Sequence, residues 1–78
     1  MNPPKAGREE GKRAALYFGA EAQENNCSFQ DYDDSIAAYY GHEKFDDMPD
    51  ELRLEARQQF RAGQERERKI KAQYRNVP

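Results

Sequence analysis

Hydrophobic residues recur every three or four positions over three stretches of the chain, which is the spacing of amphipathic α-helices. In the first stretch, residues 8–24, the inward positions are Gly11, Ala15, Phe18 and Ala22. Gly19 also lies within it, and a glycine inside a helix costs about 1 kcal/mol relative to alanine. Either another helix approaches closely at Gly19, or the helix is weak there. Asn25 or Asn26 is expected to adopt the left-handed conformation that ends a helix.

The second stretch, residues 33–40, is short and is followed by Gly41, a common helix terminator. Asp31 or Asp33 is expected to cap its first turn. The residues predicted to face inward are Ile36, Tyr39 and Tyr40.

The third and longest stretch covers residues 49–74, with Asp47 as the expected cap and Pro49 in the first turn. Its apolar stripe, interrupted at Glu67, consists of Leu52, Ala56, Phe60, Gly63, Ile70 and Tyr74. The half that follows Gly63 is mostly charged and is predicted to project beyond the core.

No segment alternates between apolar and polar residues as a strand does, so the sequence predicts an all-α fold. We expect a small three-helix domain over residues 8–75, with a long C-terminal helix. Residues 1–7 contain two prolines and a glycine and are expected to form a mobile tail.

The chain has 78 residues, of which 36% are hydrophobic and 36% are charged, and this is near the lower size limit for one independent domain. A core of this size rarely supplies more than roughly 3–5 kcal/mol. The first residues lack the apolar segment of a secretory signal, and no apolar run is long enough to span a bilayer. We therefore expect a cytoplasmic protein without a membrane partner.

Catalytic residue patterns are absent from the sequence. Cys27 is the only cysteine and His42 the only histidine, fifteen positions apart, so no thiol–base pair is indicated. The acidic run from Asp31 begins like a calcium loop, but Ile36 and His42 stand where glycine and glutamate are required. We therefore predict no enzyme, metal, cofactor or small-molecule substrate. Cys27 is interpreted as a small residue of the core.

Charge is strongly segregated along the chain. Residues 1–20 carry a net charge of +2, residues 21–51 carry −9, and residues 52–78 carry +5. Arginines at 53, 57 and 61 form a ridge, because residues four apart share a helix face. The basic residues predicted to contact RNA phosphates are Arg8, Lys12, Arg13, Arg53, Arg57, Arg61, Arg68 and Lys69. The competing interpretation is a solvated face with ion pairs Glu65–Lys69 and Glu67–Lys71.

The acidic centre offers a second kind of binding surface. Carboxylates at 31, 33, 34, 46 and 47 are interspersed with aromatic residues, among them Phe45. Such a surface suits contact with a basic protein, and it can imitate the charge of nucleic acid. The residues predicted to bind such a partner are Tyr32, Asp33, Asp34, Tyr39 and Tyr40. This alternative describes an inhibitor, of the kind encoded by phages or mobile elements, of a nucleic-acid-binding protein.

The segment "EGKRAALYFGAEAQENNCSF" followed by "ARQQFRAGQERE" resembles the ribosome modulation factor family. Gly11 and Gly19 correspond to glycines of that family's first helix, and Cys27 and Phe29 to its Cys-Pro-aromatic turn. The run 60–63 corresponds to an aromatic-x-x-Gly signature. Ser28 replaces the proline, Phe60 stands where tryptophan is usual, and an acidic insert separates the halves. The resemblance implies a non-catalytic module that docks on ribosomal RNA and protein and regulates translation.

Overall fold

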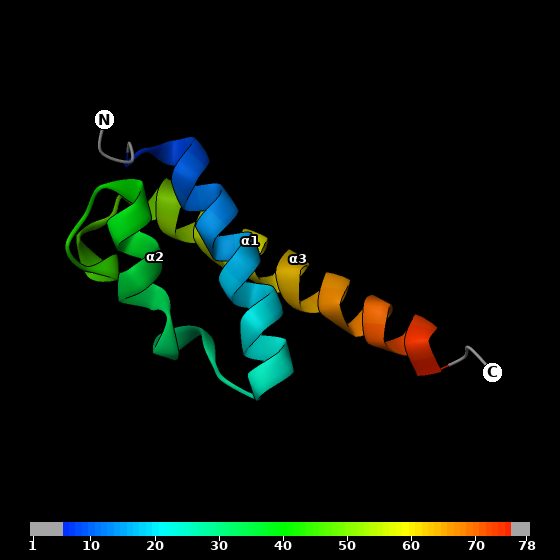
Figure 1. Cartoon of the computed structure of the whole chain (residues 1–78). Coiled ribbons are helices and arrows are strands. Elements are labelled where there is room, and N and C mark those ends of the chain that lie inside the picture. Colours follow the sequence, from blue (N-terminus) through cyan, green and yellow to red (C-terminus); the bar gives the residue numbers. More distant parts are fainter. Residues whose placement is uncertain (1–5, 76–78) are drawn as a thin grey trace, which may run out of the picture.

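The computed structural model describes residues 6–75, and these residues form helices and connecting turns (Figure 1). Three α-helices follow one another: α1 (Arg8–Asn25), α2 (Asp33–Tyr40) and α3 (Asp50–Arg75). Two 3₁₀ turns, η1 (Phe29–Asp31) and η2 (Phe45–Asp47), lie in the connections. The all-α fold is therefore confirmed, and each predicted helix boundary agrees within one residue. Helix α1 packs against both other helices, while the second half of α3 extends past them (Figure 1).

Two glycines allow α1 and α3 to cross in direct backbone contact. A Cβ atom on Gly19 would lie 2.0 Å from the carbonyl oxygen of Phe60, and one on Gly63 would lie 2.1 Å from that of Leu16. Both glycines are buried. The close-approach interpretation of Gly19 is therefore correct. Gly11 has a related role on α1, because its missing side chain leaves room for the ring of Tyr40.

The core combines small residues at the helix crossings with larger residues from α2, η2 and α3. Its buried members are Ala15, Ala22, Ile36, Ala37, Tyr40, Phe45, Met48, Ala56 and Phe60. Phe45 and Met48 come from a connection that showed no helical period, and Phe45 had been grouped with the surface aromatics. That expectation was wrong, since Phe45 is only 4% exposed. Its ring lies 5.1 Å, centroid to centroid, from that of Phe29.

The helix ends partly follow the expected pattern. Asn26 ends α1 in the left-handed region with φ 59°, and Gly41 ends α2 with φ 96°. The predicted caps of α2 were wrong, because Tyr32 occupies the cap position and no side chain caps it. Asp31 instead closes a capping box with Ser28 around η1.

The start of α3 also differs from the prediction. Asp47 does not cap this helix, because it belongs to η2 and is separated from α3 by two residues. The carbonyl of Pro49 accepts hydrogen bonds from the N–H groups of Leu52 and Arg53, and so forms the first helical turn.

The apolar stripe of α3 is buried only as far as Gly63. Ile70 is 39% exposed and Tyr74 is 76% exposed, so the expectation that they face the core was wrong. The reason is that α1 and α3 diverge beyond their crossing (Figure 1). Tyr39 was also expected to face inward, but it is 47% exposed.

The expected N-terminal tail falls mostly outside the described residues, which begin at Ala6. Gly7, within the expected tail, donates its N–H to the carbonyl oxygen of Tyr39 at 3.0 Å. Among residues 6–75, no helix has the length and apolar character required to cross a bilayer.

Candidate functional site: an arginine ridge on α3

The predicted RNA-contact residue Arg8 is exposed, but its guanidinium is paired with Glu55 of α3. Its Nε and Nη2 donate to Oε2 of Glu55 at 2.9 and 2.7 Å, and the hydroxyl of Tyr40 donates to Oε1 of Glu55 at 3.0 Å. The hydrogen bond with Arg8 holds the pKa of Glu55 below its usual range. Burial, followed by the bond to Glu55, raises the pKa of Tyr40. This network ties the start of α1 to α2 and α3.

Most other predicted RNA contacts on α1 and α3 have a carboxylate partner three residues earlier. These pairs are Lys12–Glu9, Arg13–Glu10, Arg53–Asp50 and Arg68–Glu65. Three of them have N–O distances of 3.6–3.8 Å. Such exposed pairs contribute about 0–1 kcal/mol each and open readily. The expected pairs Glu65–Lys69 and Glu67–Lys71 do not form among the described residues.

Arg57 and Arg61 differ from these residues. Both are exposed, and neither has an ion-pair partner within residues 6–75. The guanidinium carbon of Arg57 lies 4.6 Å from the ring centroid of Phe29 and 5.2 Å from that of Phe45. These cation–π contacts stabilise the position of the side chain without neutralising its charge. We call Arg57 and Arg61 together the arginine ridge.

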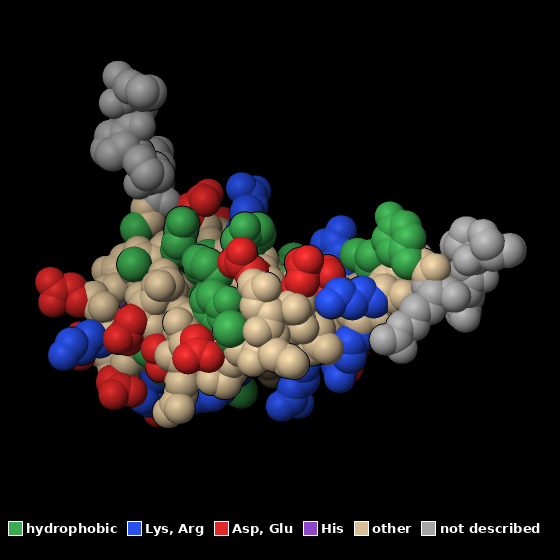
Figure 2. All heavy atoms as spheres, turned by 60° about the horizontal axis from the view of Figure 1, so that its bottom comes forward, with side chains coloured by type: hydrophobic (Ala, Val, Ile, Leu, Met, Phe, Trp, Pro, Cys, Tyr) green, Lys and Arg blue, Asp and Glu red, His purple; other side chains and the backbone are tan. Residues whose placement is uncertain are grey.

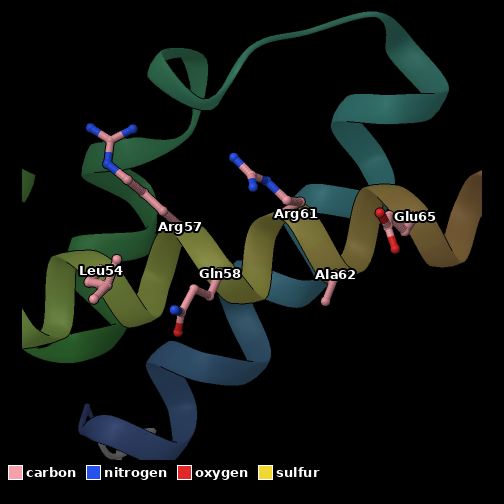
Figure 3. A pocket seen from close by; sticks show the side chains of 6 residues that line it. All are labelled: Leu54, Arg57, Gln58, Arg61, Ala62 and Glu65. Atoms are coloured by element: carbon pink, nitrogen blue, oxygen red, sulfur yellow. The ribbon is translucent and has the colours of Figure 1, made fainter.

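Figure 3 shows the arginine ridge from close by. Arg57 and Arg61 extend to the same side of α3, whereas Gln58 and Ala62 point the other way. A shallow hollow of about 450 Å³ lies on that second side and is lined by both arginines together with Leu54, Gln58, Ala62 and Glu65. On the other side, toward η1, a hollow of about 310 Å³ is lined by both arginines together with Ser28, Phe29, Phe60 and Gln64.

The remaining basic residues do not form one continuous patch with the ridge. Arg68 follows Arg61 by seven residues, about two turns, and so continues the same stripe of α3. Lys69 is exposed and lies about a quarter turn further around the helix. Arg13 lines a different hollow, of about 380 Å³, between α1 and α3 together with Arg66. The set predicted from sequence is therefore divided over several surfaces.

Three carboxylates of the acidic centre, those of Asp31, Asp33 and Asp34, have structural roles. Asp31 Oδ2 accepts hydrogen bonds from the N–H and the hydroxyl of Ser28, at 2.8 and 3.2 Å. Asp33 Oδ1 accepts the N–H of Asp34 at 2.7 Å, and Asp34 Oδ1 accepts the N–H of Phe45 at 2.9 Å. These side chains therefore hold the turns on either side of α2.

The tyrosines predicted to accompany these carboxylates are mostly enclosed. Tyr40 is 5% exposed, so its ring belongs to the core and not to the surface. Tyr32 is half-buried and stacks on Phe18 with a centroid distance of 5.1 Å. Only Tyr39 among the three predicted tyrosines is largely exposed.

Cys27 and His42 each form a hydrogen bond with a backbone carbonyl close by in the sequence. Cys27 is partly buried against the core, and its thiol donates to the carbonyl oxygen of Asn25 at 3.6 Å. His42 is half-buried, and its backbone N–H donates to the carbonyl of Ala37. Over the described part of the chain, no group of histidine, cysteine and carboxylate side chains is arranged to hold a metal ion.

The charge segregation of the sequence is retained on the surface. On the face in Figure 2, most acidic side chains lie toward one end, with basic ones among them, whereas lysines and arginines predominate toward the end where α3 projects. Among residues 6–75, only the pair Arg8–Glu55 joins charges that are far apart in sequence. Within residues 6–75, Arg53–Asp50 is the only ion pair that joins the acidic segment 21–51 to the basic segment 52–78.

Sequence reasoning missed the residues that line the hollow beside the arginine ridge, among them Phe29 and Gln64. Phe29 reaches Arg57 only because η1 folds back over α3, and Gln64 carries no charge that would single it out. A signal was present for Gln64: residues 57, 60, 61 and 64 recur at the spacing of one helix face.

Comparisons of the chain with protein-family models, with curated proteins and with solved structures found no match.

Proposed function

We propose that this chain is a small non-catalytic protein of the cytoplasm that binds RNA through the arginine ridge. The resemblance to the ribosome modulation factor family makes ribosomal RNA and the protein around it the proposed target. Binding there would regulate translation without any chemical step.

The observation that carries this proposal is that the side chains of Arg57 and Arg61 are exposed and have no ion-pair partner within residues 6–75. Other guanidinium groups, at Arg8 and Arg53, are engaged by carboxylates, but these two remain exposed and without a carboxylate among the described residues. Phosphate contacts by such groups release counterions and supply most of the affinity for nucleic acid. The two side chains are one helical turn apart, so both can contact the same strand.

The acidic centre supports the alternative function less well. Asp31, Asp33 and Asp34 already accept backbone hydrogen bonds, and Tyr40 is buried. Each of these carboxylates keeps a second oxygen for a further contact, but the buried ring of Tyr40 cannot take part in one. The RNA-binding proposal relies only on exposed side chains.

The test is fluorescence anisotropy with a labelled fragment of ribosomal RNA over a series of salt concentrations. Wild-type affinity should fall steeply as salt rises. Arg57→Glu and Arg61→Glu should each weaken binding and make the slope of log K against log salt shallower by about 0.7–0.9 for every lost phosphate contact. Arg61→Glu is the cleaner variant, because Arg57 also contacts Phe29 and Phe45.

Arg66→Glu is the matched control, since it makes the same charge change on the same helix. Arg66 is exposed and lies about two and a half turns beyond Arg57, on the opposite side of α3. Its replacement should affect RNA affinity much less. Equal losses in all three variants would show that net charge, and not the ridge, determines binding. Unchanged affinity in both ridge variants would refute the proposal.

A further inference from the structure

The hollow between η1 and α3 combines three kinds of group that single-stranded RNA requires. The half-buried ring of Phe29 gives it an aromatic side, and Phe60, 3% exposed, lies beneath it. The arginine ridge forms one border, and Gln64 and Ser28 add polar atoms. The hollow on the other side of the ridge has no aromatic residue in its lining. The two sides of the ridge are therefore chemically different.

Arg57 is held in a position from which it can stack on a base. Its guanidinium packs over Phe29 on one side, and the side chain is otherwise exposed. Unstacked bases in RNA complexes pack on aromatic rings and on the planes of arginine guanidinium groups. The contacts with Phe29 and Phe45 restrict the side chain before RNA arrives, which lowers the entropy lost on binding.

Gln64 supplies the group that could contact the edge of a base. A glutamine amide both donates and accepts hydrogen bonds, as base edges require. Within residues 6–75 its side chain has no hydrogen-bond partner. The Ser28 hydroxyl donates to Asp31 and also accepts the N–H of Asp31 in the capping box, which leaves one of its two lone pairs for a further hydrogen bond.

We propose that this hollow binds one unstacked nucleobase of single-stranded RNA, an inference that rests on the proposed function. The base packs on the plane of the Arg57 guanidinium, whose N–H groups at the edge remain available to a phosphate. The edge of the base bonds to Gln64, and Arg61 contacts the neighbouring phosphate. A base inside a duplex cannot enter, because it remains stacked between its neighbours. The protein should therefore prefer single-stranded RNA to the same sequence in a duplex.

The first measurement compares a short RNA strand, alone and annealed to its complement, at one salt concentration. The single strand should bind at least about fivefold more tightly, as expected for one stacked base. Gln64→Ala should weaken single-strand binding about two- to tenfold, as expected for one hydrogen bond, and should leave the salt slope unchanged. Gln58→Ala, the same replacement in the opposite hollow, should have no effect.

Arg57→Lys separates stacking from charge. It keeps the positive charge and removes the planar guanidinium. Single-strand affinity should fall about fivefold or more, while duplex affinity and the salt slope stay as in the wild type. Equal affinity for both RNA forms, or equal behaviour of Gln64→Ala and Gln58→Ala, would overturn the base site and leave the arginine ridge intact. If the wild-type protein bound neither form of RNA, the proposed function would be overturned as well.

Discussion

Replacing Gly63 with alanine sets helix propensity directly against helix packing. Propensity alone predicts a gain, because alanine is about 1 kcal/mol better than glycine inside a helix. The new Cβ, however, would lie 2.1 Å from the Leu16 carbonyl oxygen and 2.9 Å from the Ala20 nitrogen. Both are backbone atoms of α1, so no side-chain rotation relieves the clash. The two helices would have to separate by about 1 Å, and a gap of that size removes a quarter to a half of each affected dispersion contact.

Overpacking of a core costs about 1–3 kcal/mol, and a clash with backbone should fall at the upper end of that range. After the gain in propensity, the net loss expected for Gly63→Ala is about 2 kcal/mol. A core of this size rarely supplies more than roughly 3–5 kcal/mol in total, so the change should be large.

The assay is urea unfolding followed by far-ultraviolet circular dichroism. Ala62→Gly is the matched control, because Ala62 is the exposed neighbour in the same helix and measures the propensity term alone. It should lose about 1 kcal/mol. If Gly63→Ala were as stable as the wild type or more stable, the close crossing of α1 and α3 would be refuted.

Two further predictions concern the network around Glu55. The hydrogen bond with Arg8 lowers the pKa of Glu55 in the folded state. The ionised carboxylate therefore stabilises the fold at pH values above the pKa of Glu55 in the unfolded chain. This stabilisation is lost as the pH falls through the lower pKa of the folded state. Glu55→Gln should therefore flatten the acid limb of a stability–pH curve, and an unchanged acid limb would contradict this. Tyr40→Phe should cost about 1 kcal/mol in urea unfolding, because it removes the hydroxyl that donates to Glu55 and keeps the buried ring.

The sequence predicted the helices well because their signals are local. Apolar spacing places Ala15 and Ala22 on one face of α1, and Gly41 ends α2 through its own backbone freedom. The burial of Phe45 could not be predicted in this way, because it depends on Asp34, eleven positions away, which accepts the Phe45 N–H. The exposure of Ile70 likewise depends on the direction in which α1 leaves α3.

The candidate site was predicted in part. The repeat of arginines at every fourth residue identified the ridge. No carboxylate stands three or four positions from Arg57, whereas Glu65 stands four positions after Arg61. The sequence could not show that Arg8 forms an ion pair with Glu55, since the two residues are 47 positions apart. Local spacing therefore found the unpaired charges but also included others that tertiary contacts engage.

The surface around the ridge provides a test that separates the two kinds of partner. Asp46 and Asp47 are exposed and follow Phe45, whose ring lies 5.2 Å from the Arg57 guanidinium. The two carboxylates therefore lie within about one Debye length, roughly 10 Å at 0.1 M salt, of the arginine ridge. At that separation their negative charges should repel an approaching phosphate. Replacing both with asparagine should strengthen RNA binding, most clearly at low salt where screening is weak.

If the acidic centre instead docks on a basic protein, the same double variant should weaken capture of that partner. Asp33 and Asp34 are poorer choices for this test, because Asp34 also holds the turn at Phe45. An RNA affinity that falls in the double variant would contradict the phosphate-binding role of the neighbouring ridge.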